Sequence, residues 1–179
     1  MRNGGYGNLN FRKIAEQLNI SKANIHHHFG NKEGLANEVI REYSSKMLIQ
    51  FKRLAVECDS GLSKFMTGAE EIFWSSCLKA DHCFFGVCDP DARISNAPDK
   101  TKIIAQEFYK NLFEIINGVV KNSLKKGKLR SALLGKQVTH QLLMLMVGLA
   151  SIVQMKATVV EAEKILRGTI QPWVKTLIA

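Results

Sequence analysis

The residues best suited to chemistry stand between positions 21 and 28, where polar side chains lie among apolar anchors. The anchors Ala23, Ile25 and Phe29 predict a short helix. Asparagine and lysine can read base edges in the major groove of DNA, and serine and lysine can bind its phosphates. The groups offered for such contacts are Ser21, Lys22, Asn24, His26, His27 and His28. The pattern therefore indicates a helix that reads DNA, although many helical hairpins share this spacing.

A preceding helix and a tight turn would position this one. The apolar residues of the preceding helix recur on one face, at Phe11, Ile14, Ala15 and Leu18. Asn10 is a favourable N-cap for it, and Ser21 is one for the second helix, which we expect from Lys22 to about His28. Asn19 and Ile20 interrupt the pattern between the two. A helix, a tight turn and a helix form the unit that places its second helix in the major groove.

Helical periodicity also covers most of the remaining chain. Asn31 is a favourable N-cap for a long helix, in which a four-residue step joins Leu35, Val39, Tyr43 and Met47. The expected helices after residue 31 span 32–57, 62–80, 101–125, 135–155 and 159–178. No segment alternates with period two for long enough to form a strand, so we predict an all-α fold of about eight helices.

Glycine and proline residues mark where these helices end or bend. Residues 81–99 lack a clean period and contain Gly86 and two prolines, so we expect a loop there with at most a helical turn. Gly127 predicts the end of the helix before it. Pro172 predicts a kink or a restart in the last helix.

The distribution of charge favours a polyanionic partner. The 179 residues carry 25 Lys and Arg against 16 Asp and Glu, a net charge of +9. Residues 1–56 hold 9 basic and 4 acidic residues, so more than half of the excess lies in less than a third of the chain. A concentrated basic excess indicates nucleic acid, and a role in solubility alone is the alternative.

The sequence offers little for other classes of function. The longest nearly apolar run, residues 142–153, is shorter than the ~20 residues of a membrane span, and the first residues lack a signal-peptide pattern. The four cysteines are too scattered for a disulfide scaffold. No phosphate loop, catalytic triad or metal-ligand set is visible, and consecutive histidines on one helix point about 100° apart. We therefore expect a cytoplasmic protein that is not an enzyme and holds neither a metal nor a cofactor.

A longer run of spaced residues carries a family resemblance. Its features are the pair Gly5-Tyr6, then Ile14-Ala15, the turn Ile20-Ser21-Lys22, a block ending in His28-Phe29, and Lys32 followed by Leu35. This run resembles the DNA-binding region of TetR-family transcriptional repressors. The resemblance implies a helix-turn-helix DNA-binding domain at 1–46, joined to a helical ligand-binding and dimerisation domain at 47–179.

The residues expected to bind double-stranded operator DNA are Asn10, Ser21, Lys22, Asn24, His26, His27 and Lys32. Lys32 matches a phosphate-binding lysine of the family, and an ordinary solvated lysine is the alternative. At a helix N-terminus a phosphate would satisfy both the ammonium and the free N–H groups. His26 stands where the family usually has Tyr, so we hypothesise that DNA affinity depends more on pH than it would with Tyr. His28 is expected to be a packed structural residue.

Members of the family have a further helix before the Gly-Tyr pair. Only four residues precede Gly5 here, so we expect that helix to be absent, either because the true start lies upstream or because this is a truncated form. Its absence would expose Ile14, Leu18 and Leu35. The alternative function that follows is a ligand- or redox-sensing helical dimer that has lost autonomous DNA binding.

The region after the long helix resembles the family less closely. Residues 82–86 are similar to a segment of one branch, in some members of which a cysteine senses electrophiles or oxidants. Cys83 is therefore a redox-sensing candidate, and a buried inert thiol is the alternative. The ligand pocket is expected within helices 62–80 and 101–125, under the 81–99 loop. Its candidate lining residues, which could equally be core, are Phe65, Phe73, Trp74, Phe85, Phe108, Phe113 and Met144. We expect no charged cluster on the inner faces, which favours an apolar or aromatic ligand.

The last two helices are the candidates for a homodimer contact. The helix at 135–155 is apolar on more than one face, which a lone surface helix does not tolerate; burial inside the monomer is the alternative. With 159–178 it would form an isologous four-helix interface. The implied function is a dimeric one-component repressor that binds palindromic operator DNA. A small apolar, aromatic or electrophilic effector would release it by a population shift.

Overall fold

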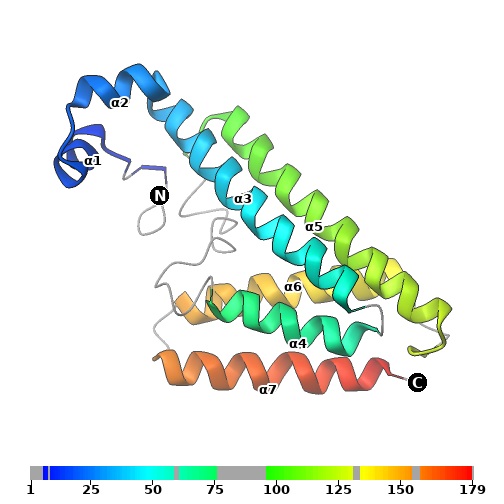
Figure 1. Ribbon diagram of the computed structural model, residues 1–179. Coiled ribbons are helices and arrows are strands. Elements are labelled where there is room, and N and C mark those ends of the chain that lie inside the picture. The colour runs from blue at the N-terminus through cyan, green and yellow to red at the C-terminus, as the bar shows by residue number, and fades with distance from the viewer. Residues whose placement is uncertain are drawn as a thin grey trace.

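The computed structural model describes residues 6–7, 9–58, 61–75, 96–130, 134–154 and 158–178. In these ranges the fold is all-α, and the only β pairing is an isolated bridge between Leu129 and Ile178. Seven helices are described there, where the sequence predicted about eight for the whole chain. They are α1 (Phe11–Leu18), α2 (Lys22–Phe29), α3 (Lys32–Glu57), α4 (Leu62–Phe73), α5 (Asp99–Lys125), α6 (Gly135–Gln154) and α7 (Val159–Leu177), as Figure 1 shows.

Side-chain caps begin the first three helices as predicted. Asn10 Oδ1 accepts from the N–H groups of Arg12 and Lys13, at 2.9 and 3.3 Å. Ser21 Oγ accepts from Asn24 N–H at 3.1 Å. Asn31 Oδ1 accepts from Gly34 N–H at 2.8 Å. Each cap satisfies donors that the first helical turn leaves free, which is why these boundaries follow from local sequence.

The predicted end of α5 at Gly127 is confirmed. Gly127 has φ +66°, and its N–H donates to the carbonyl of Leu124 at 3.0 Å. The next N–H, of Lys128, donates to the carbonyl of Ser123, also at 3.0 Å. This pair of bonds is a Schellman motif, which favours glycine because the backbone turns left-handed.

The inward face of α3 differs from the predicted four-residue stripe. Leu35 and Met47 are buried, but Val39 is 39% exposed and Tyr43 only half-buried. Four residues turn about 40° beyond one full helical turn, so a strict step of four drifts off the buried face. The buried positions instead mix steps of one, three and four: Leu35, Ala36, Asn37, Ile40, Ser44, Met47 and Phe51.

Helix α7 continues through Pro172, so the restart predicted there was wrong. Pro172 is exposed, and its missing N–H removes one helical hydrogen bond. Ile170 and Val174 on either side are buried at 2% and 0% exposure. The packing of Ile170 and Val174 holds α7 together where that hydrogen bond is missing.

Two separate hydrophobic clusters organise the described residues. The smaller contains Phe11, Ala15, Ile25 and Leu35. The larger begins at Ile40 and draws on α3 to α7. Figure 1 shows α1 and α2 at one end of the molecule, with α3 leading away from them beside α5. Helix α4 packs against α7, and α6 packs against both α5 and α7. Helix α3 contributes residues to both clusters, and the predicted division into domains at 1–46 and 47–179 stays a prediction.

Buried polar groups tie α3 and α6 to α5. Thr101 Oγ1 donates to Asn37 Oδ1 at 2.7 Å, and both residues are buried. Farther along, Thr139 Oγ1 lies 3.5 Å from Asn117 Oδ1 and donates to the carbonyl of Gly135 at 2.9 Å. These contacts fix the register of the long helices against α5, because a shift would leave buried polar atoms unpaired.

One acidic side chain is buried between α4 and α7. Glu70 is 3% exposed, and its Oε1 has no hydrogen-bond partner among the described residues. Burial raises the pKa of Glu70, while a hydrogen bond from Gln171 and the charge of Arg167 act in the opposite direction. Folding therefore favours the protonated carboxyl. The stabilisation from that proton is present below the ordinary pKa of 4.5 and is lost as pH rises through the raised value.

We expect Glu70→Gln to raise the melting temperature by about 2–4 °C near pH 7, because the amide removes a buried charge. The advantage should shrink toward pH 4. Thermal unfolding followed by circular dichroism at both pH values measures this. Glu71→Gln is the matched control, since Glu71 is exposed and pairs with Arg167 at 3.1 Å. An equal melting temperature of wild type and Glu70→Gln at pH 7 would contradict the expectation.

Candidate nucleic-acid interface

A tight left-handed turn sets the angle between α1 and α2. Asn19 has φ +53°, a region that asparagine tolerates better than most residues. The N–H of Ile20 donates to the carbonyl of Ala15 at 3.0 Å and closes the end of α1. Ile25, 2% exposed, then anchors α2 in the smaller cluster. The predicted helix, turn and helix are therefore present.

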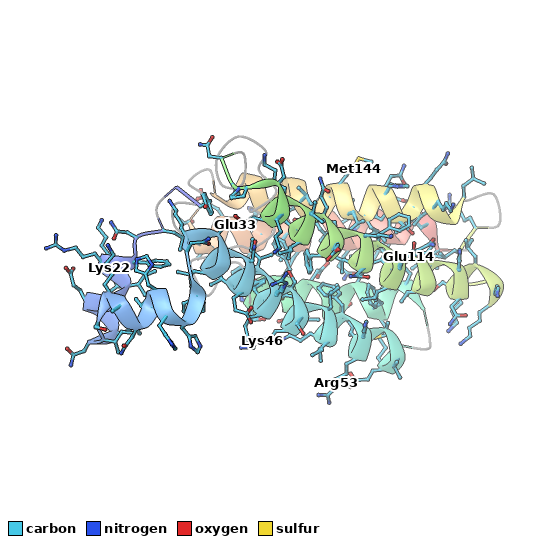
Figure 2. All side chains as sticks on the ribbon, turned by 90° about the horizontal axis from the view of Figure 1, so that it is seen from above. Lys22, Glu33, Lys46, Arg53, Glu114 and Met144 are labelled. Atoms are coloured by element: carbon cyan, nitrogen blue, oxygen red, sulfur yellow. The ribbon has the colours of Figure 1, made fainter. Side chains whose placement is uncertain are left out.

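The polar face of α2 lies open to solvent. The predicted DNA-binding residues that the structure leaves exposed are Asn10, Ser21, Lys22, Asn24, His26 and His27. Ser21 and Asn10 also serve as helix caps through their side-chain oxygens. Figure 2 shows Lys22 at the end of the molecule far from Arg53, at the opposite end of α3. The fold thus gathers these residues on one protruding module, and their contact with DNA stays a prediction.

His26 has one ring nitrogen engaged within the module. Its Nδ1 lies 3.2 Å from the carbonyl oxygen of Gly30, and its ring lies 4.6 Å from the Phe11 ring, edge to face. A carbonyl oxygen can only accept, so Nδ1 carries the hydrogen in this contact. The neutral ring then has Nε2 as a bare acceptor. Only the protonated ring can donate from Nε2 to a phosphate.

The other two histidines point elsewhere. The His28 ring lies 5.0 Å from the Phe29 ring, edge to face, yet His28 is exposed. We expected His28 to be a packed structural residue. Its ring does pack against Phe29, but its side chain is not buried. Among the side chains that the structure describes, no three His, Cys, Asp or Glu residues gather as they would around a metal ion.

Lys32 binds the segment that precedes α1. Its Nζ donates to the carbonyl of Gly7 at 2.9 Å and lies 4.7 Å from the centre of the Tyr6 ring. Both contacts suit an ammonium, which carries three donors and is attracted to a ring face. Lys32 is half-buried, and donors remain for a phosphate. The sequence argument missed this role, because nothing local indicates a contact over 25 residues.

The corner between α2 and α3 leaves no room for a side chain at Gly34. A Cβ there would overlap the carbonyl oxygen of Phe29. Gly30, before the corner, has φ +70°. The smaller cluster closes over this corner, and Leu35 is 6% exposed within it. The expected exposure of Leu35 was therefore wrong, Ile14 is half-buried, and Leu18 is exposed at 62%.

The predicted effector residues divide into separate groups. Phe65, Phe73 and Phe108 lie buried in the larger cluster, and Trp74 packs against it half-buried. The structure places the remaining candidates as follows: Phe113 half-buried with its ring 4.8 Å from that of His140, Met144 66% exposed on α6, and Phe85 and Cys83 outside the described residues. The sequence argument also missed the single buried acid Glu70 on α4.

Met144 belongs to an apolar groove between α6 and α7. The groove has a volume of about 440 Å³. Its apolar lining residues are Met144, Leu145, Leu149, Ile165 and Trp173. Gly148 adds no side chain to this wall, and a Cβ there would meet nothing within 4 Å. The groove therefore presents apolar surface on the two helices predicted for dimerisation. Within the described ranges, each helix is too short or too polar to cross a bilayer.

Known proteins share both the N-terminal region and the fold. Residues 1–39 match the sequence model of a family described as bacterial regulatory proteins, tetR family. A TetR-family transcriptional regulator from Agrobacterium tumefaciens has a TM-score of 0.84 at 17% identity, over 98% of this chain and 90% of that chain. A TetR transcriptional regulator from Legionella pneumophila has a TM-score of 0.72 at 21% identity, over 92% and 88%.

A third structure, the transcriptional regulator FadR from Bacillus subtilis in complex with stearoyl-CoA, has a TM-score of 0.69 at 16% identity, over 92% and 87%. A comparison with curated proteins finds none that matches the sequence. The N-terminal region is therefore similar in sequence to the tetR family, and the chain shares the fold of these solved regulators. The shared fold is all-α, with a helix-turn-helix near the N-terminus.

We expect the DNA affinity of wild type to depend more on pH, at constant ionic strength, than that of His26→Tyr, because only a protonated His26 ring can donate at Nε2 while Nδ1 donates to Gly30. His26→Tyr should remove most of that dependence. His27→Tyr, on the neighbouring position of α2, should keep it. Fluorescence anisotropy with labelled duplex DNA provides the measurement. A wild-type affinity that does not change with pH would contradict this role for His26.

Proposed function

We propose that this protein is a cytoplasmic transcriptional repressor that binds palindromic operator DNA as a homodimer and is released by a small effector. The observation that carries the proposal is the exposed polar face of α2 on a rigid, capped helix-turn-helix. Lys22 and Asn24 stand near the start of that helix, where recognition helices contact base edges. The basic excess of residues 1–56 favours the same partner.

The α6–α7 groove supports the homodimer. Exposed apolar surface of this kind marks an interaction site on a soluble protein. The two helices are long and packed against one another, so two copies related by a two-fold axis would bury both grooves in one isologous interface. Such a dimer would carry two copies of α2, as a palindromic operator requires.

The proposed effector is apolar or aromatic and would bind between α4 and α5. Phe65, Phe73 and Phe108 supply aromatic surface there. FadR from Bacillus subtilis holds stearoyl-CoA on the same fold, which supports an effector with an apolar part. The proposal keeps Cys83 as the group for an electrophilic effector. It requires no turnover, so the protein acts without catalysis.

The effector would act through α3. This helix begins at the recognition module and packs along α5 in the larger cluster. A ligand that favours one packing of α3 on α5 would change the separation of the two α2 helices in the dimer. DNA binding would fall by population shift, to the extent that the ligand prefers that arrangement.

Two substitutions separate the proposed phosphate and base contacts. Lys32→Ala should weaken binding to every duplex alike. It should also reduce the slope of log affinity against log salt concentration by about one. Asn24→Ala should reduce sequence preference, at a cost of about 1–3 kcal/mol on the preferred duplex. Anisotropy on DNA from upstream of the protein's own gene, and on a scrambled duplex, measures both. Lys46→Ala is the control, because Lys46 lies on α3 beyond the module and pairs with Glu42 at 2.7 Å. Loss of non-specific affinity alone in Asn24→Ala would contradict the base contact.

A single charge placed in the α6–α7 groove should prevent dimerisation. We expect Met144→Glu to raise the dissociation constant of the dimer at least about ten-fold, because a carboxylate would be buried at the interface. Ile103→Glu is the matched control and should leave the dimer intact, since Ile103 is 54% exposed on α5 and lies outside the groove. Sedimentation velocity distinguishes the two species. If Met144→Glu remained dimeric, the interface would lie elsewhere.

A further inference from the structure

A second groove lies between α3 and α5, with a volume of about 270 Å³. The pair Asn37–Thr101 aligns the starts of the two helices, and Figure 1 shows α5 following α3 side by side in the same direction. The groove opens between positions 41–52 of α3 and 104–111 of α5. It is separate from the α6–α7 groove, with which it shares no lining residue.

The floor of this groove is apolar except for one hydroxyl. Ile104 and Phe108 are 8% and 1% exposed, and Leu48 is half-buried. Ser44 also lines the groove at 7% exposure, and its Oγ is buried without a hydrogen-bond partner among the described residues. A buried hydroxyl in this state is costly, and a polar atom of a ligand would relieve that cost.

The rim is positively charged toward the C-terminal end of α3. Arg41 and Lys52 stand eleven positions apart, roughly 16 Å along the helix, and neither forms an ion pair with a residue that the structure describes. Glu107 supplies the acidic side chain of the lining. Because Asn37 on α3 is level with Thr101 on α5, Glu107 lies closer to the level of Arg41 than to that of Lys52. At the Lys52 end the lining therefore offers an ammonium and, from Asn111, an amide. Glu114, one turn beyond Asn111 on α5, is not among the lining residues.

We propose that the α3–α5 groove binds a small amphiphilic anion, a carboxylate on a short apolar or aromatic body. The carboxylate would bind the ammonium of Lys52 and the amide of Asn111. The body would cover Leu48 and Phe108, with room for a polar substituent to reach Ser44. A volume of about 270 Å³ corresponds to roughly nine water molecules, so a ligand of about ten non-hydrogen atoms fits.

This site does not depend on the proposed function. Its lining shares only Phe108 with the predicted effector residues. Ligand binding can be measured without DNA. A failure to bind the anion would therefore leave the repressor proposal standing, and a failure to bind DNA would leave this site standing.

The test is a fluorine NMR titration of the full chain with 4-fluorobenzoate, beside the uncharged 4-fluorobenzamide. Lys52→Glu reverses the charge at the binding end, with Lys46→Glu as the control on an exposed part of α3 outside the groove. Ser45→Phe fills the groove from its exposed rim and leaves the buried floor intact, with Lys46→Phe as its control. Circular dichroism of each variant checks that the helical fold is retained.

We expect saturable binding of 4-fluorobenzoate by wild type and both controls, and at least about ten-fold weaker binding of 4-fluorobenzamide. Lys52→Glu should weaken 4-fluorobenzoate binding at least about ten-fold, and Ser45→Phe should abolish it. The proposal is overturned if wild type shows no saturable binding. It is also overturned if binding survives Lys52→Glu, because the ion would then occupy another place on the protein.

Discussion

Helix α3 takes part in both hydrophobic clusters, and the rest of the structure depends on that sharing. Leu35 is buried with α1 and α2, whereas Ile40 is buried with the long helices. The two residues lie less than two turns apart on one continuous helix. The orientation of α2 therefore follows the packing of α3, which is held against α5 by the buried pair Asn37–Thr101.

The corner between α2 and α3 fixes how the exposed polar face of α2 is oriented relative to α3. Gly34 packs against the carbonyl of Phe29 so closely that no side chain fits, and Lys32 holds Tyr6 and Gly7 over the start of α3. These contacts hold the module against the start of α3. Two packed helices have few alternative arrangements, so a change in the packing of α3 on α5 would also change the position of α2.

Local chemistry explains what could be predicted from the sequence. The caps at Asn10, Ser21 and Asn31 and the stop at Gly127 depend on neighbouring residues, so the starts and ends of those helices could be inferred directly. Contacts between distant residues could not. The burial of Glu70, the Lys32 contact with Tyr6 and the inward face of α3 arise from tertiary packing, for which a single sequence carries no local signal.

The most direct test of the account is the selection of binding sites by this protein from random duplex DNA, with the number of bound protomers determined by sedimentation. The account predicts enrichment of a palindrome bound by two protomers. Its half-sites should be centred one helical turn apart, about 34–36 Å, or a multiple of that distance. Failure to enrich any sequence, or enrichment of a single half-site bound by one protomer, would contradict the account.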